Sequence, residues 1–108
     1  MTHSDDILYR RFLQGDTTSY DELMIRHGDS LLLFLNGYLH NWHDAEDLMI
    51  EVFARIMVKR PSIREGGFKA YLYKTARNLA SRFHARSVRM NAFSIDEMQE
   101  DIAGNEII

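Results

Sequence analysis

The chain has 108 residues, of which 45% are hydrophobic, and its formal net charge is −3. This length suits one domain with its own core, and the hydrophobic content is too high for a disordered chain. The lack of cysteine excludes disulfides and thiolate metal sites. No apolar run approaches the roughly 18 residues that a membrane span needs. Since the N-terminus has no cleavable signal pattern, a cytoplasmic protein is the default prediction.

The charges are divided along the chain. Residues 1–58 hold ten acidic and four basic side chains, and residues 59–90 hold one acidic and nine basic side chains. Residues 91–108 hold five acidic side chains and no basic ones. A basic block between two acidic blocks predicts two kinds of partner on one small domain.

Two helices are predicted before residue 40. Ser4 can cap a short first helix, which Gly15 ends. Asp16, Thr18 or Ser19 can cap the second helix, and Ser19 to Glu22 has the spelling of a capping box. Gly28-Asp29 either kinks or weakens this second helix. Its apolar residues repeat over about five turns and predict the centre of the core, namely Tyr20, Leu23, Met24, His27, Leu31, Phe34, Leu35 and Tyr38.

A third helix is predicted from about His43 to Lys59. Its core side should carry Ala45, Leu48, Val52, Phe53 and Ile56. The opposite side mixes acidic and apolar residues, namely Asp47, Ile50, Glu51, Ala54 and Val58. An exposed face should not carry Ile, Ala and Val among its acids unless something covers them, so this pattern predicts a partner surface.

Two other interpretations of these acids remain open. Taken alone, acidic residues near a helix N-terminus are typical of a solvated face that suits the helix dipole. A carboxylate metal site is disfavoured, because no histidine follows any of these acids at three or four positions further along the helix. His40 and His43 are three positions apart, but they lie on either side of a predicted break.

The segment Phe68 to Arg89 contains neither proline nor glycine and predicts a long last helix. Pro61 ends the third helix, and residues 60–67 form a loop with two cations and two flexible glycines. One stripe of the last helix is apolar, namely Phe68, Tyr71, Leu72, Ala76, Leu79 and Phe83. Beyond Phe83 the next position of the stripe is Arg86, with Arg89 beside it. Because guanidinium groups are not buried without partners, this helix should leave the core as a cationic arm.

Aromatic and basic residues are interleaved in this last helix, as single-stranded nucleic acid requires. Tyr71 lies at the edge of the apolar stripe, and this position is equally consistent with packing in the core and with a functional contact to nucleic acid. Tyr73 lies on the far side with Lys74 and Arg77 and is harder to explain as packing. The arginines at 82, 86 and 89 could also be a solvated helix end, where cations suit the dipole.

After Met90 the apolar pattern fades. This acidic segment predicts either a linker or a short helix from Ser94. The chain has no internal repeat and no strand pattern of useful length. The predicted fold is therefore all-α, a compact bundle of three long helices plus a short N-terminal helix.

Two motifs carry a resemblance to a known family. The first is Asp44-Ala45-Glu46-Asp47-Leu48 followed by Glu51-Val52-Phe53, and the second runs from Phe68 through Tyr71-Leu72-Tyr73 to Ala76-Arg77-Asn78. Together they resemble region 2 of the bacterial sigma-70 family, above all its small extracytoplasmic-function (ECF) group. The likeness covers about residues 5–90, and two motifs in the right order and at the right separation are far more specific than one.

The resemblance implies a transcription initiation factor module. Its acidic helix would bind the clamp helices of the largest subunit of RNA polymerase core, and an anti-sigma factor is a further candidate partner. Its last helix and the preceding loop would recognise and melt the minus-ten promoter element, on the single-stranded non-template strand. The implied polymerase contacts are Asp44, Asp47, Ile50, Glu51 and Ala54. The implied DNA contacts are Arg60, Ser62, Arg64, Lys69, Tyr71, Tyr73, Lys74, Arg77, Asn78 and Arg82.

The sequence departs from the family pattern in three ways. Ile50 replaces the usual glutamine, so that polymerase contact is expected to be apolar. Tyr71 replaces a tryptophan and offers a smaller stacking surface. The family's second DNA-binding domain, region 4, is absent, so residues 1–90 are expected to be a region 2-like domain, residues 91–108 an acidic linker or tail, and the chain a fragment of a longer protein.

Two rival function classes fit the sequence less well. A duplex DNA-binding regulator of the helix-turn-helix kind would need a tight turn and a short second helix, whereas this chain has an eight-residue loop and a last helix of about 22 residues. An enzyme would need a nucleophile beside a base, a phosphate loop or a metal cluster, and the sequence shows none of these. We therefore predict no enzymatic activity and no cofactor.

Overall fold

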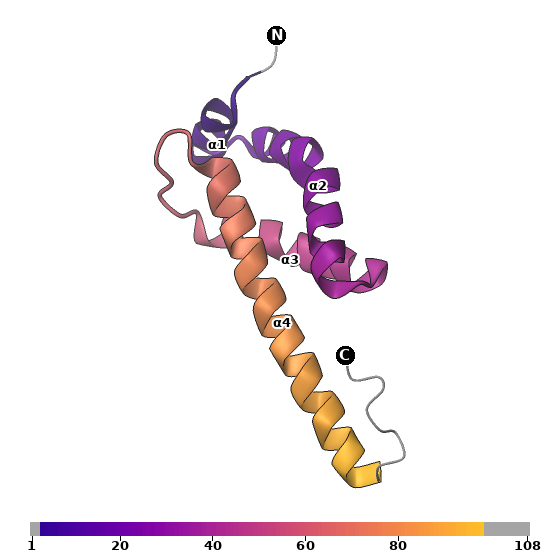
Figure 1. Ribbon diagram of the computed structural model, residues 1–108. Coiled ribbons are helices and arrows are strands. Elements are labelled where there is room, and N and C mark those ends of the chain that lie inside the picture. Colours follow the sequence, from indigo (N-terminus) through magenta and orange to yellow (C-terminus); the bar gives the residue numbers. More distant parts are fainter. Residues whose placement is uncertain (1–2, 99–108) are drawn as a thin grey trace.

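The computed structural model describes the backbone of residues 3–98 and the side chains of residues 3–86. The described part is all-helical, as predicted, and shows no strand. The short N-terminal helix and the three long helices are α1 (Asp5–Leu13), α2 (Thr17–Leu39), α3 (Trp42–Lys59) and α4 (Phe68–Met98) (Figure 1). None of the described helices is long and apolar enough to cross a membrane.

Side-chain caps explain where the first three helices begin. Ser4 caps α1 as predicted, its Oγ accepting the Ile7 N–H at 3.3 Å. Asp16 caps α2, accepting the Thr18 N–H at 3.1 Å and the Thr18 and Ser19 hydroxyls at 2.6 and 3.0 Å. These two hydroxyls hold the pKa of the Asp16 carboxyl below its ordinary value. The capping box expected at Ser19 is therefore wrong, because Ser19 is buried and donates to the cap.

The junction of α2 and α3 is a single tight corner. His40 takes the left-handed conformation (φ 52°), and the Asn41 side chain accepts the Asp44 N–H at 2.9 Å. As a result, α3 begins at Trp42, one residue before the predicted start. Within α2 the helix is uninterrupted at Gly28, where an added Cβ would lie 3.9 Å from the Met49 sulfur of α3.

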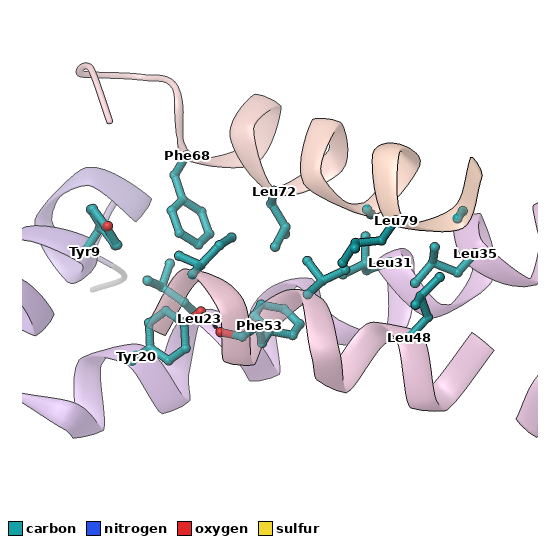
Figure 2. Close-up of a cluster of buried hydrophobic side chains, with 14 of the residues drawn as sticks. Tyr9, Tyr20, Leu23, Leu31, Leu35, Leu48, Phe53, Phe68, Leu72 and Leu79 are labelled. Atoms are coloured by element: carbon teal, nitrogen blue, oxygen red, sulfur yellow. Dashed lines mark hydrogen bonds between the residues drawn. The ribbon is translucent and has the colours of Figure 1, made fainter. Parts of the chain in front are cut away.

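The core lies between α2, α3 and α4, with α1 packed on α2 and α4, and Figure 2 shows side chains of α4 pointing into it. Tyr20 is fully buried, its ring 4.5 Å from that of Phe12, and its hydroxyl donates to the Phe53 carbonyl at 2.7 Å. Burial raises the pKa of Tyr20 well above its ordinary value, and Tyr9 nearby adds to the effect. The five residues predicted for the core side of α3 are all buried.

A polar cluster fixes α1 to α2 beside this core. Asp5 accepts from Arg26 Nη1 at 2.8 Å and lies 2.9 Å from His27 Nε2. The buried His27 ring also packs against Phe68 of α4, with 5.7 Å between ring centroids. A histidine thus takes an apolar position of the α2 stripe because a carboxylate from α1 satisfies its ring nitrogen.

Only the first part of α4 packs on the other helices, and the rest extends beyond them (Figure 1). Phe68, Leu72, Ala76 and Leu79 are buried, whereas Arg82 and Arg86 are exposed. This agrees with the predicted arm as far as residue 86; the side chain of Arg89 lies outside the described part. The helix continues through Ser94 to Met98, so no separate helix starts at Ser94, and residues 99–108 of the expected tail lie outside the described residues.

Candidate functional site

The outward side of α3 is the first candidate surface. Asp47, Ile50, Glu51 and Ala54 are all exposed there, and Asp44 is half-buried. Ile50 exposes 60% of its surface, which is unusual for a large aliphatic side chain between two acids. The structure thus brings the five predicted polymerase-contacting residues onto the exposed part of one helix.

Beside Ile50 lies an apolar depression of about 220 Å³ that sequence reasoning missed. Its residues come from α2 and α3, because the lack of a side chain at Gly28 leaves room between the two helices. Methionines near a glycine in the middle of a helix could have indicated this depression, because flexible methionine side chains are common at adaptable binding surfaces. The lining residues are Met24, Gly28, Met49, Ile50, Phe53, Ala54 and Met57.

Glu51 is already paired within its own helix. Its Oε2 accepts from Arg55 Nη2 at 3.0 Å and from Arg55 Nε at 3.1 Å, and both side chains are nearly half exposed. A solvent-exposed pair four residues apart contributes only about 0.3–0.5 kcal/mol. The Glu51 carboxylate is therefore available to another cation at little cost.

The second candidate surface is formed by the loop of residues 60–67 and the start of α4. A cavity of about 410 Å³ lies between them. It brings together four of the predicted DNA-contacting residues, Ser62, Arg64, Tyr71 and Lys74, with Ile63, Gly67 and Ala70. The cavity between loop and helix thus combines two cations with an aromatic ring.

Tyr71 also lines a second cavity, of about 170 Å³, between α3 and α4. Asn78 and Arg82 of α4, two of the predicted DNA contacts, line it together with Arg55 and Lys59 of α3, which the sequence analysis did not single out. Arg55 and Lys59 are four residues apart in the sequence and therefore lie on one side of α3. Only the packing of α3 on α4 shows that this side lines the cavity. Because Tyr71 is half-buried between two basic cavities, it contributes to packing and remains accessible.

Arg60 is placed differently from the other predicted DNA contacts. Its Nη2 donates to the Leu13 carbonyl at 2.9 Å and to the Phe12 carbonyl at 3.2 Å. Its guanidinium also lies 4.6 Å above the Phe12 ring centroid, within the range of a cation–π contact. The guanidinium therefore satisfies carbonyls at the C-terminus of α1.

Three other predicted residues lie outside both cavities. Lys69 and Arg77 are exposed on α4. Tyr73 is half-buried, and its ring meets that of Phe34 edge to face, with 5.1 Å between centroids. The expectation that packing does not explain Tyr73 is wrong, because α2 supplies an aromatic partner.

Comparisons with known proteins identify the family. The sigma-70 region 2 family matches residues 23–90. A curated relative, ECF RNA polymerase sigma factor SigE of Mycolicibacterium smegmatis, is 33% identical over 66 residues, which cover 61% of this chain and 26% of the relative. The match thus spans about a quarter of that relative's length, and no solved structure matches significantly. Its name agrees with the ECF group predicted above, and the chain belongs to the sigma-70 family, with residues 23–90 as its region 2.

Proposed function

We propose that this domain binds RNA polymerase core through the exposed side of α3, and that it recognises and helps to melt the minus-ten promoter element through the loop and α4. The observation that carries the proposal is the cavity between Ser62, Arg64, Tyr71 and Lys74 in a member of the sigma-70 family. Cations, an aromatic face and loop backbone are what a single-stranded base with its phosphate requires.

The α3 surface suits a helical partner that is both basic and apolar. Exposed carboxylates at Asp47 and Glu51 attract cations, while Ile50 and the depression beside it accept an apolar side chain. An apolar centre with a charged rim is the usual arrangement of a protein interface. The clamp helices of the polymerase are the proposed partner, and an anti-sigma factor that covers the same surface would compete with them.

The DNA surface divides into two tasks. Exposed cations of α4 such as Arg77 pair with phosphates, which carry no sequence information. The cavity beside Tyr71 holds an unstacked base, whose edges face the loop at Ser62 and Arg64. On this proposal the loop sets base preference and the helix sets general affinity.

A loop exchange tests this division. Residues 62–65 are replaced by the loop of another family member, while Gly66 and Gly67 are kept, and binding to single strands that differ at one base is measured in the polymerase-bound form. The preferred base should change with the salt dependence nearly kept. Lys69→Ala is the control and should weaken all strands alike, because Lys69 lies outside both cavities.

An unchanged base preference after the exchange would remove the proposed reading pocket. Tight, sequence-specific binding of the isolated chain to duplex DNA would instead favour a helix-turn-helix type of regulator.

A further inference from the structure

Three contacts join the loop of residues 60–67 to α1, far away in the sequence (Figure 1). The Tyr9 hydroxyl donates to the Pro61 carbonyl at 2.6 Å, and Arg60 donates to the last carbonyls of α1. The Gly66 N–H donates to both carboxylate oxygens of Asp6, each at 2.9 Å. The loop is therefore held by α1 at both of its ends.

The anchored positions enclose the residues that line the cavity. Arg60 and Pro61 are held on one side and Gly66 on the other, so only residues 62–65 lie between the anchors. Within this short span, Ser62 and Arg64 border the cavity beside Tyr71. Any shift of either anchor would change where these two side chains lie relative to Tyr71.

The two glycines of the loop form a hydrogen-bonded turn. Gly66 has φ +78°, which suits glycine, and its N–H is bound by Asp6. The Gly67 N–H donates to the Arg64 carbonyl at 3.0 Å, and a Cβ at Gly67 would lie 3.1 Å from that oxygen. These contacts hold the backbone of Arg64, a residue of the cavity, close to the Asp6 anchor.

Asp6 is the charged group that α1 itself supplies to these anchors, beside the Tyr9 hydroxyl and the last backbone carbonyls. A carboxylate that accepts a backbone N–H forms a charge-assisted bond, stronger than a neutral one. Asp6 lies in the first turn of α1, where the helix dipole favours a negative charge. A loop held in its binding conformation loses less entropy on binding, and this sharpens the difference between ligands that fit and ligands that do not.

We propose that Asp6 is a specificity-determining positioning residue, which acts on base preference through Gly66 without touching DNA. This inference depends on the proposed function of the loop. Asp6 lies outside residues 23–90, so the anchor belongs to a part of the chain that the family match does not include.

The test compares Asp6→Ala with Asp5→Ala in the 108-residue chain. Both variants remove one acid from the first turn of α1, so both lose a carboxylate that the helix dipole favours. Asp5 contacts Arg26 and His27 of α2 and takes no part in the bond between Asp6 and Gly66. The Asp5 variant thus controls for lost stability and lost charge.

The first measurement is amide hydrogen exchange of Gly66 by NMR, whose spectrum also reports whether each variant is folded. Exchange at Gly66 should accelerate by about tenfold or more in Asp6→Ala, because a bond to a charged acceptor is lost. In Asp5→Ala it should change no more than exchange in the core helices does. Unchanged exchange at Gly66 in Asp6→Ala would overturn the proposed anchor.

The second measurement is the ratio of affinities for the best and worst base at one position of a single strand, in the polymerase-bound form. Asp6→Ala should lower this affinity ratio several-fold and leave the salt dependence of binding unchanged. Asp5→Ala should leave the affinity ratio unchanged. Faster Gly66 exchange with an unchanged ratio would overturn the positioning role. A ratio of one in the unaltered chain would instead show that the proposed function itself fails, and the positioning role with it.

Discussion

Tyr20 joins two helices through one hydroxyl in an otherwise apolar core. Its ring is covered by Phe12 and Phe53, and its hydroxyl reaches the Phe53 carbonyl of α3. That carbonyl is within a helix and keeps its helical bond if the hydroxyl is lost. The Tyr20 hydroxyl therefore contributes as one additional hydrogen bond and not as the sole partner of a buried group.

Tyr20→Phe should lower the free energy of unfolding by about 0.5–1.5 kcal/mol near neutral pH. Because the pKa of Tyr20 is raised in the folded state, the native phenol keeps its proton above about pH 10, where the unfolded one loses it. The stability contributed by Tyr20 is complete below that pH and falls as the pH rises further, so the difference between the two proteins should shrink. Urea unfolding at pH 7 and above pH 10 measures this.

Tyr38→Phe is the matched control at pH 7, because its ring is 40% exposed and a surface substitution should change stability by less than about 0.5 kcal/mol. A Tyr20→Phe protein as stable as the unaltered chain at pH 7 would contradict the importance of the hydroxyl.

Helix α3 has one side in the core and one side facing outward. Its predicted core residues are buried, and its predicted exposed residues are exposed. The periodicity of the sequence was sufficient to predict both sides of α3, because the side chains on one side of a helix recur every three to four residues. The proposed polymerase surface can therefore be altered without changing the core.

Glu51→Lys should weaken binding to RNA polymerase core by about tenfold or more, because a cation would replace a carboxylate opposite a basic partner. The fold should remain, since Glu51 is exposed and its pair with Arg55 contributes little. Asp21→Lys, at an exposed position of α2, makes the same charge change outside the depression and is the control. Binding of Glu51→Lys to core at the affinity of the unaltered chain would show that the partner surface lies elsewhere.

The cations of α4 have a separate role in the proposal. Arg77 is exposed and lies outside both cavities. Arg77→Ala should weaken single-stranded DNA binding equally for all sequences and lower the salt slope by up to about one unit. Fluorescence anisotropy of the polymerase-bound form at several salt concentrations measures both quantities, and Arg11→Ala on α1 is a control with the same loss of charge. A change of base preference in Arg77→Ala would contradict the division between helix and loop.

Contacts between distant segments limited what the sequence could predict. The stripes of α3 and α4, the α2 stripe except for the exposed Tyr38, and most caps follow from local chemistry and agree with the structure. The packing contacts of Arg60 and Tyr73 were not predicted, because their partners Phe12 and Phe34 lie 48 and 39 positions away in the sequence. No periodicity encodes such a pair. The Asp6–Gly66 anchor was missed for the same reason, since its partners are 60 positions apart.

At the scale of the whole molecule, acidic and basic surfaces are separated. The acids of α3 face outward, whereas basic side chains border the cavities beside Tyr71 and continue along α4. On the proposed function, this separation would let one small domain attract a basic partner and a nucleic acid without either one covering the other's surface.

The isolated chain should bind duplex promoter DNA weakly, because its proposed reading pocket needs an unpaired base and its net charge is −3. Binding should be stronger for a single strand of the same sequence, and addition of RNA polymerase core should strengthen it further. Gel-shift titrations with both probes, with and without core, would measure the difference. Equal affinity for duplex and single strand without core would contradict the proposal.

The ion pair between Glu51 and Arg55 also links the two surfaces. Glu51 belongs to the outward side of α3, and Arg55 lines the basic cavity between α3 and α4. In the proposed complex, a polymerase cation that binds Glu51 leaves Arg55 free for a phosphate, so the two ligands exchange ionic partners across one helical turn. By thermodynamic reciprocity each ligand then favours the other. Since an exposed pair of this spacing contributes about 0.5 kcal/mol, this cooperativity is limited to roughly a twofold gain in affinity.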